Sequence, residues 1–197
     1  MDSPTFPKDC RSLLSKHLSP SLHRALRDKE TGFGFTFEQL INSGLKNLDS
    51  GIGVYAGDEE SYEVFAALLD PIIEEYHGFG GDARHQSNLN ADDLDAPNPD
   101  PEGEYVISTR IRVGRTLQHF PLGPAIHRQS RQIAERMIAG ALARLQGDLR
   151  GRYYPLLGMP KEIQTQLIAD HFLFKEGDRF LEAAGLNRDW PEGRGIY

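Results

Sequence analysis

The segment from Tyr105 to Val113 most constrains how this chain of 197 residues can fold. Its side chains alternate as in a β-strand, with apolar residues and Thr109 on one face and mostly polar residues on the other. An isolated strand leaves backbone hydrogen-bonding groups unpaired and therefore requires neighbouring strands. We expect a strand here that pairs with short strands elsewhere in the chain or with segments beyond Tyr197.

Two arginines, Arg110 and Arg112, would lie on the same face of this strand. A guanidinium stays charged, and its planar fork matches phosphate oxygens, so two of them on a rigid element can hold a polyphosphate. Gly114 and Arg115 follow and can bring a third cation close. Arginine is also a common residue on the solvated face of an antiparallel strand, so the spacing alone leaves both interpretations open.

Composition excludes several classes of function. The net charge of −7 argues against broad electrostatic binding to nucleic acid or an anionic membrane. With 39% hydrophobic residues the chain can build one or two cored domains. Cys10 is the only cysteine, no apolar run reaches membrane-spanning length, and residues 1–8 lack the apolar core of a signal peptide. We expect a soluble, cytoplasmic protein.

The N-terminal part reads as helical. Ser19 and Pro20 match an N-cap followed by a first-turn proline. Thr36 and Gln39 form a capping-box pattern before a run of apolar residues at helical spacing. The residues of this second helix expected to face inward are Phe37, Leu40, Ile41, Gly44, Leu45 and Leu48.

A third helix is predicted over about Asp58 to Tyr76, with a kink or interruption at Pro71. Its expected inward residues are Tyr62, Phe65, Leu69, Ile72 and Tyr76.

Residues 78–103 are rich in Gly, Asp, Asn and Pro and have little periodicity, which is typical of a linker. The linker contains Asp92, Asp93 and Asp95, but a calcium loop is excluded because the turn glycine and the closing glutamate are missing. We interpret this acidic stretch as a solvated loop.

Three further helices are predicted after the strand. An amphipathic helix spans about Arg128 to Gln146, another begins at Pro160, and a short one ends near Gly185. The residues expected to face inward are Ile133, Met137, Ala141 and Leu145 in the first, Ile163, Leu167 and His171 in the second, and Phe180 and Leu181 in the third. The fold class is therefore α+β: a small all-α N-terminal domain (residues 1–90) followed by the start of an antiparallel-sheet domain flanked by helices (residues 91–197).

A glycine-rich loop, residues 49–57, follows the second helix. It is not a Walker loop, since no Gly-Lys-Ser/Thr follows, and it lacks the spacing and preceding strand of a dinucleotide fingerprint. One interpretation is a plain connector between helices. The other is a ligand loop, because glycines let backbone groups approach a small polar molecule and Tyr55 adds a hydroxyl.

Four segments resemble the phosphagen (guanidino) kinases, the family that includes arginine kinase and creatine kinase. They are Tyr105–Arg115, Gly151–Leu156, Asp170–Phe180 and Trp190–Tyr197. The resemblance covers nearly the whole chain from about Leu18. It implies reversible transfer of the γ-phosphoryl group of MgATP to a guanidino substrate, which buffers cellular ATP, and it makes residues 91–197 the first part of the catalytic domain.

The resemblance also implies three groups of site residues. The guanidino specificity loop, expected to hold the substrate's carboxylate, consists of Ser50, Gly51, Ile52, Gly53, Val54 and Tyr55. The residues expected to bind ATP or ADP are Ser108, Thr109, Arg110, Ile111, Arg112 and His171. Asp49 and Arg179 match a pair that links the two domains on closure. No protein ligand for a metal is predicted, because the nucleotide mainly holds the Mg²⁺.

The loop sequence from Asn47 to Tyr55 is similar to that of arginine kinases. The sequences of residues 26–31, 56–65 and 188–191 are more similar to creatine kinase. Since loop length limits the size of the substrate, the loop favours L-arginine, with creatine or another guanidino compound as the alternative. Trp190 leaves both a monomer and a homodimer open.

In this family the carboxylate that positions the guanidinium, a nearby cysteine and further phosphate-binding arginines follow the match to Gly193–Tyr197. The resemblance therefore implies an N-terminal fragment without catalytic residues, and Cys10 is not the counterpart of the family's cysteine. The alternative to an enzyme fragment is a non-catalytic protein, a remnant that binds a nucleotide or a guanidino compound.

Overall fold

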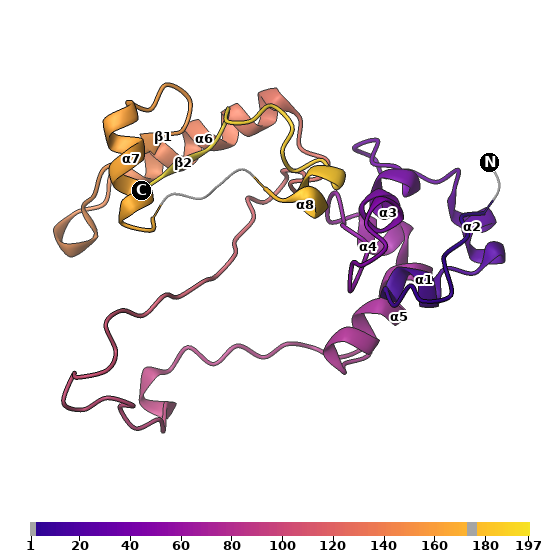
Figure 1. Cartoon of the computed structure of the whole chain (residues 1–197), viewed down its shortest axis with the longest axis horizontal. Coiled ribbons are helices and arrows are strands. Elements are labelled where there is room, and N and C mark those ends of the chain that lie inside the picture. The colour runs from indigo at the N-terminus through magenta and orange to yellow at the C-terminus, as the bar shows by residue number, and fades with distance from the viewer. Residues whose placement is uncertain (1–2, 173–176) are drawn as a thin grey trace.

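The computed structural model describes residues 3–172 and 177–197. The chain forms a helical N-terminal part, a long extended excursion, and a second helical part with a two-stranded sheet (Figure 1). Residues 173–176 of the motif quoted above lie outside the described residues. No helix in the described ranges is long and apolar enough to cross a lipid bilayer.

The N-terminal part contains the predicted helices with the predicted caps. Its elements are α1 (Leu13–His17), α2 (Pro20–Leu26), α3 (Phe37–Lys46), α4 (Ser61–Val64) and α5 (Ala66–His77). The Ser19 hydroxyl accepts a hydrogen bond from the Leu22 N–H at 3.1 Å. The Thr36–Gln39 capping box is confirmed, with both reciprocal hydrogen bonds formed.

The core of this part is a cluster of apolar side chains from α1, α3 and α5. Its fully buried members include Leu14, Leu40, Phe65 and Leu68. Burying an aliphatic or aromatic side chain of this size stabilises a fold by about 1.5–3 kcal/mol, so the cluster holds the short helices together. Leu48, predicted to extend the α3 stripe, lies beyond the end of the helix and is exposed.

The predicted helix over 58–76 is divided into α4 and α5, and the division falls at Phe65 rather than at Pro71. Phe65 has φ −110° and ψ 18°, which ends α4 while burying the phenyl ring. Tyr62 and Tyr76 are exposed, so their predicted place in the core is wrong. The division changes the helical phase, and Tyr76 lies on the last turn of α5, beyond the core cluster.

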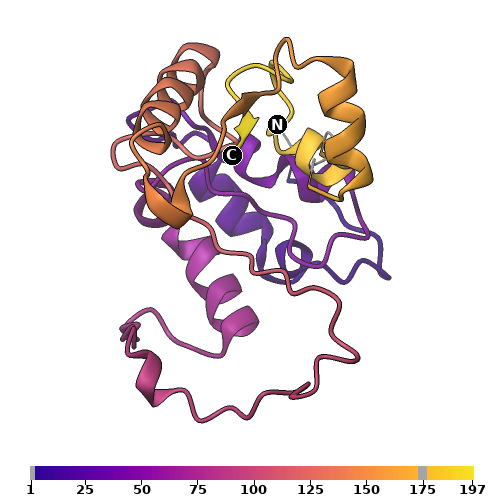
Figure 2. The same ribbon diagram turned by 90° about the vertical axis from the view of Figure 1, so that its left-hand side faces the viewer.

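Residues 78–115 run as an extended loop away from the helices (Figures 1 and 2), interrupted by the 3₁₀ turn η1 (Ala91–Asp93). The predicted strand Tyr105–Val113 is absent, and Ile107 is completely exposed. A strand exists only through pairing, and no described segment pairs with this one. Its start is fixed by Asp100, whose carboxylate accepts the N–H groups of Tyr105 and Val106 at 2.8 and 2.7 Å.

The second part begins when the chain returns to the helices, where the Leu122 N–H donates to the Gly57 carbonyl at 2.7 Å. Its elements are α6 (Arg128–Leu142), η2 (Gly147–Leu149), β1 (Tyr154–Pro155), α7 (Lys161–Ala169), α8 (Arg179–Ala183) and β2 (Gly195–Ile196). Strands β1 and β2 pair antiparallel, with Tyr154 opposite Ile196. The protein is thus mostly helical, and its described antiparallel sheet is this one pair.

Helix α6 ends at Leu142, earlier than predicted, and its inward face differs. Met137 and Ala141 are exposed, whereas Arg131 is buried and donates to the Arg188 carbonyl and the Asp189 carboxylate, both at 3.0 Å. Apolar residues at helical spacing face inward only where another element covers them. Here the residues after α8 cover the face of α6 that carries Arg131, and not the face that carries Met137 and Ala141. His171 lies beyond the end of α7, at φ 58°.

His23 predicts a pH dependence of stability. The ring is buried edge-on against Phe37, at 5.9 Å between centroids, and its Nδ1 has no partner among the described residues. Burial, with the neighbouring Arg27, lowers the pKa of His23 below its ordinary value of 6.5. As the pH falls, the unfolded chain therefore binds a proton at His23 at a higher pH than the folded chain does. Neutral His23 contributes its full stabilisation of the fold above pH 6.5, and this stabilisation is lost as the pH falls below that value.

We expect His23→Gln to flatten the fall in the thermal unfolding midpoint between pH 7 and pH 5. The matched control is His85→Gln, which removes an exposed histidine from the linker and should leave the slope as it is. Parallel curves for the unsubstituted chain and His23→Gln would contradict the expectation.

Candidate functional site

The glycine-rich loop is fixed to the helices through its carbonyl groups. The Leu13 and Leu14 N–H groups of α1 donate to the Gly51 and Ile52 carbonyls at 3.0 and 2.9 Å. The Gly44 N–H of α3 donates to the Gly53 carbonyl at 3.1 Å. These three bonds hold the loop backbone in one conformation against two helices.

The N–H groups of the same loop remain available. In residues 3–172 and 177–197, no acceptor reaches the N–H groups of Gly51, Ile52, Gly53 or Val54. Backbone N–H groups need a partner when they are covered, so consecutive unused donors form a site for an anionic oxygen. The loop is therefore bound to the helices through its carbonyl groups, while these N–H groups are left for a ligand.

Close approach of α3 and the loop depends on Gly44 and Gly53. A Cβ atom placed on Gly44 would lie 2.4 Å from the Gly53 carbonyl oxygen and 2.7 Å from the Gly53 Cα. Gly53 itself has φ 90°, a conformation that other residues rarely adopt. The two glycines thus set the distance between helix and loop.

A cavity of about 500 Å³ opens on this loop. It is lined by Asp49, Ser50, Gly51, Ile52, Gly53, Val54, Tyr55, Tyr76, Asp178, Phe180 and Leu181. The structure therefore brings together all six residues of the predicted specificity loop and both α5 and α8. Sequence reasoning missed Tyr76 as a site residue because its helical spacing placed it in the core.

Helix α8 reaches the cavity because α3 binds its backbone; the two helices lie side by side (Figure 1). The Asn42 amide donates to the Ala183 carbonyl at 2.7 Å, and the buried Ser43 hydroxyl donates to the Phe180 carbonyl at 2.8 Å. Asn42 thus supplies a donor to the last carbonyl of this five-residue helix. Ser43 adds a second donor to the Phe180 carbonyl, which also accepts the Ala184 N–H at 3.0 Å.

Asp49 and Arg179 are in direct contact. The guanidinium donates to both carboxylate oxygens of Asp49 and, at 3.1 Å, to the side-chain carbonyl of Asn47. The hydrogen bond from Arg179 lowers the pKa of Asp49, and the same contact raises the pKa of Arg179. The pair joins the loop to α8; its part in domain closure stays a prediction.

The residues predicted to bind nucleotide are not gathered into a site by the described contacts. Arg110 donates to the His171 carbonyl at 2.9 Å, which joins two of the six. The other four, Ser108, Thr109, Ile111 and Arg112, are exposed on the extended excursion. Their nucleotide role stays a prediction, because it requires the pairing that would make this segment a strand.

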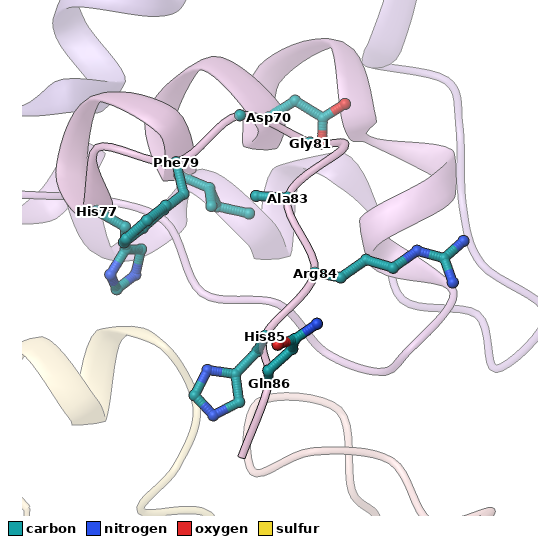
Figure 3. A pocket seen from close by; sticks show the side chains of 10 residues that line it. Asp70, His77, Phe79, Gly81, Ala83, Arg84, His85 and Gln86 are labelled. Carbon is teal, nitrogen blue, oxygen red and sulfur yellow. The ribbon is translucent and has the colours of Figure 1, made fainter. Parts of the chain in front are cut away.

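A larger cavity, about 690 Å³, lies elsewhere, between the end of α5 and the loop that follows it (Figure 3). It contains none of the predicted site residues, and much of its wall is linker. In Figure 3 the Arg84 side chain extends away from His77 and Phe79, so the polar groups do not converge on one point. We therefore assign the candidate site to the smaller cavity on the glycine-rich loop.

We expect that replacing Gly44 by alanine destabilises the protein. In an open helix Gly→Ala gains about 1 kcal/mol, but overpacking a close contact costs about 1–3 kcal/mol. The Cβ of Gly44→Ala meets backbone, which cannot rotate away, so we expect the free energy of unfolding in urea to fall by roughly 1–2 kcal/mol. Gly140→Ala in α6, where nothing lies within 4 Å, is the control and should gain about 0.5–1 kcal/mol. A gain in both variants would contradict the tight helix–loop contact.

Comparison with known proteins matches two parts of the chain. Residues 8–74 match the ATP:guanido phosphotransferase N-terminal domain, and residues 133–197 match the ATP:guanido phosphotransferase C-terminal catalytic domain. An arginine kinase of Procambarus clarkii is 51% identical over 96% of this chain and 53% of its own length. An arginine kinase of Anthopleura japonica is 52% identical over 96% of this chain and 27% of its own length.

Solved structures of related enzymes share the fold. A crystal structure of lombricine kinase aligns with a TM-score of 0.82 and 34% identity over 97% of this chain and 53% of that one. The substrate-free duplicated taurocyamine kinase from Schistosoma mansoni aligns with a TM-score of 0.86 and 37% identity over 94% of this chain and 26% of that one. The chain thus spans about a quarter to half the length of these relatives. With its two domain matches on either side of the extended excursion, the chain belongs to the ATP:guanido phosphotransferase family.

Proposed function

We propose that this chain contributes the guanidino-substrate site of an enzyme that reversibly transfers the γ-phosphoryl group of MgATP to L-arginine. The observation that carries the proposal is the set of N–H groups of residues 51–54, which meet no acceptor among the described residues, in a loop that lines a cavity of about 500 Å³. Such donors suit the carboxylate of an amino-acid substrate.

Tyr55 supports the same proposal. Its side chain lines the cavity, and burial, together with the charge of Asp178, raises the pKa of the phenol. The hydroxyl therefore stays protonated at neutral pH and can donate a hydrogen bond to an anionic substrate group. A substrate carboxylate would be held by backbone donors on one side and by this hydroxyl on another.

Phosphoryl transfer to a guanidinium nitrogen requires in-line reactants and neutralisation of charge on the moving group. On this proposal the nucleotide contacts Ser108, Thr109, Arg110, Ile111, Arg112 and His171, and the arginines neutralise its phosphates. On this proposal Mg²⁺ is held mainly by ATP or ADP. No residue of this chain is proposed as the carboxylate that positions the guanidinium.

The choice of L-arginine rests on the loop and on the degree of identity. The two arginine kinases are 51% and 52% identical to this chain, whereas the lombricine and taurocyamine kinases are 34% and 37% identical. Creatine or another guanidino compound is the alternative. We place the enzyme in the cytoplasm, as a monomer or a homodimer. The Trp190 ring is half-buried beneath the guanidinium of Arg194, at 5.1 Å.

The test is calorimetric titration of the purified chain with L-arginine, creatine, taurocyamine and ATP, each separately, alongside an assay for phosphoarginine with MgATP. We expect L-arginine to bind at least tenfold more tightly than creatine, because only arginine carries an amino-acid carboxylate of the right reach. We expect no phosphoarginine, because the positioning carboxylate is not in this sequence. Equal affinities for creatine and L-arginine would contradict the assignment of L-arginine as the substrate. Binding of ATP alone would favour the non-catalytic nucleotide-binding remnant.

A further inference from the structure

Two carboxylates line the substrate cavity, and they differ in what they already bind. Asp49 is engaged by both arms of the Arg179 guanidinium. Asp178 is engaged on one oxygen only: its Oδ1 caps α8 and accepts the N–H groups of Phe180 and Leu181 at 3.0 and 3.1 Å. In the described parts of the chain, no donor reaches its Oδ2.

The charge of Asp178 is only partly offset, because it interacts with the charge of Arg179 without a hydrogen-bonded ion pair between the two. The adjacent cation, Arg179, is committed to Asp49 and Asn47, and its guanidinium stacks on the Phe180 ring at 4.4 Å. No ion pair of Asp178 occurs among residues 3–172 and 177–197. Its field reaches the specificity loop, since it raises the pKa of the Tyr55 hydroxyl. The same cavity is therefore lined by the loop that carries the backbone donors and by a carboxylate that has no ion pair among the described residues.

An amino-acid substrate complements this arrangement. Its carboxylate and its ammonium group are attached to the same carbon, so a carboxylate bound to the N–H groups of residues 51–54 places the ammonium at the same end of the cavity. Asp178 lines this cavity together with the loop, and its neighbour Arg179 contacts Asp49 at the start of the loop. Creatine carries no ammonium group and would gain nothing from this charge.

We propose that Asp178 is a specificity residue whose carboxylate binds the α-ammonium group of an amino-acid guanidino substrate. This inference rests on the proposed function, because it assumes that the substrate carboxylate lies on the loop. It adds to that function the reason why the site would select an α-amino acid over guanidino acids that lack the amine.

The experiment compares two ligands on two forms of the chain. L-Arginine and 5-guanidinopentanoate share the guanidinium and the carboxylate, but only L-arginine has the ammonium. Asp178→Asn removes the charge and keeps a good N-cap, so α8 retains its start. We expect the affinity for L-arginine to fall about tenfold or more, the scale of a charge-assisted hydrogen bond, and the affinity for 5-guanidinopentanoate to change less than about twofold.

Glu182→Gln is the matched control, since it removes an exposed carboxylate from the same helix but outside this cavity, and it should leave both affinities as they are. Hydrogen exchange at the Phe180 and Leu181 amides checks that the introduced asparagine still caps α8. An equal loss for both ligands in Asp178→Asn, or no loss for either, would overturn this inference and leave the proposed function standing. Absence of binding of either ligand to the unsubstituted chain would overturn both.

Discussion

The hydrogen bonds from α3 to the backbone of α8 are the constraint on which the candidate site depends. A helix of five residues is far too short to be stable alone, so its position comes entirely from tertiary contacts. Asn42 and Ser43 supply these contacts by donating to the Ala183 and Phe180 carbonyls. Any other placement of α8 would lose these two hydrogen bonds, each of which contributes about 0.5–1.5 kcal/mol. Once α8 is fixed, one wall of the cavity is fixed with it.

The Asp49–Arg179 pair has a different role from these buried bonds. Both side chains are more than half exposed, and ion pairs of this kind contribute little to stability. The pair instead orients the start of the loop against the start of α8. Because the contact lowers the pKa of Asp49, the carboxylate is charged at neutral pH, and the pair is lost as the pH falls through this lowered pKa. The stability of the helices behind the cavity responds at higher pH, through His23.

Local chemistry explains which parts of the fold are readable from the sequence. The Ser19 cap and the Thr36–Gln39 capping box are determined by residues within one turn, and both form. The strand at Tyr105–Val113 fails because alternation states only which side chains would share a face, while pairing depends on partners that no described segment supplies. Tyr76 and Met137 were misplaced for a related reason: spacing defines a stripe on a helix but not what covers it.

The candidate site combines backbone donors, which do not depend on the identity of the side chains, with side chains that line the same cavity. Residues 51–54 offer backbone N–H groups, and a substitution that keeps the loop conformation keeps these donors. Such a set binds any suitably placed carboxylate and cannot by itself distinguish one guanidino acid from another. Discrimination must therefore come from the side chains around the loop, of which Tyr55, Tyr76 and Asp178 carry polar groups and come from different segments. We infer that the charge of Asp178 at the start of α8 supplies part of this discrimination, which the loop sequence alone does not reveal.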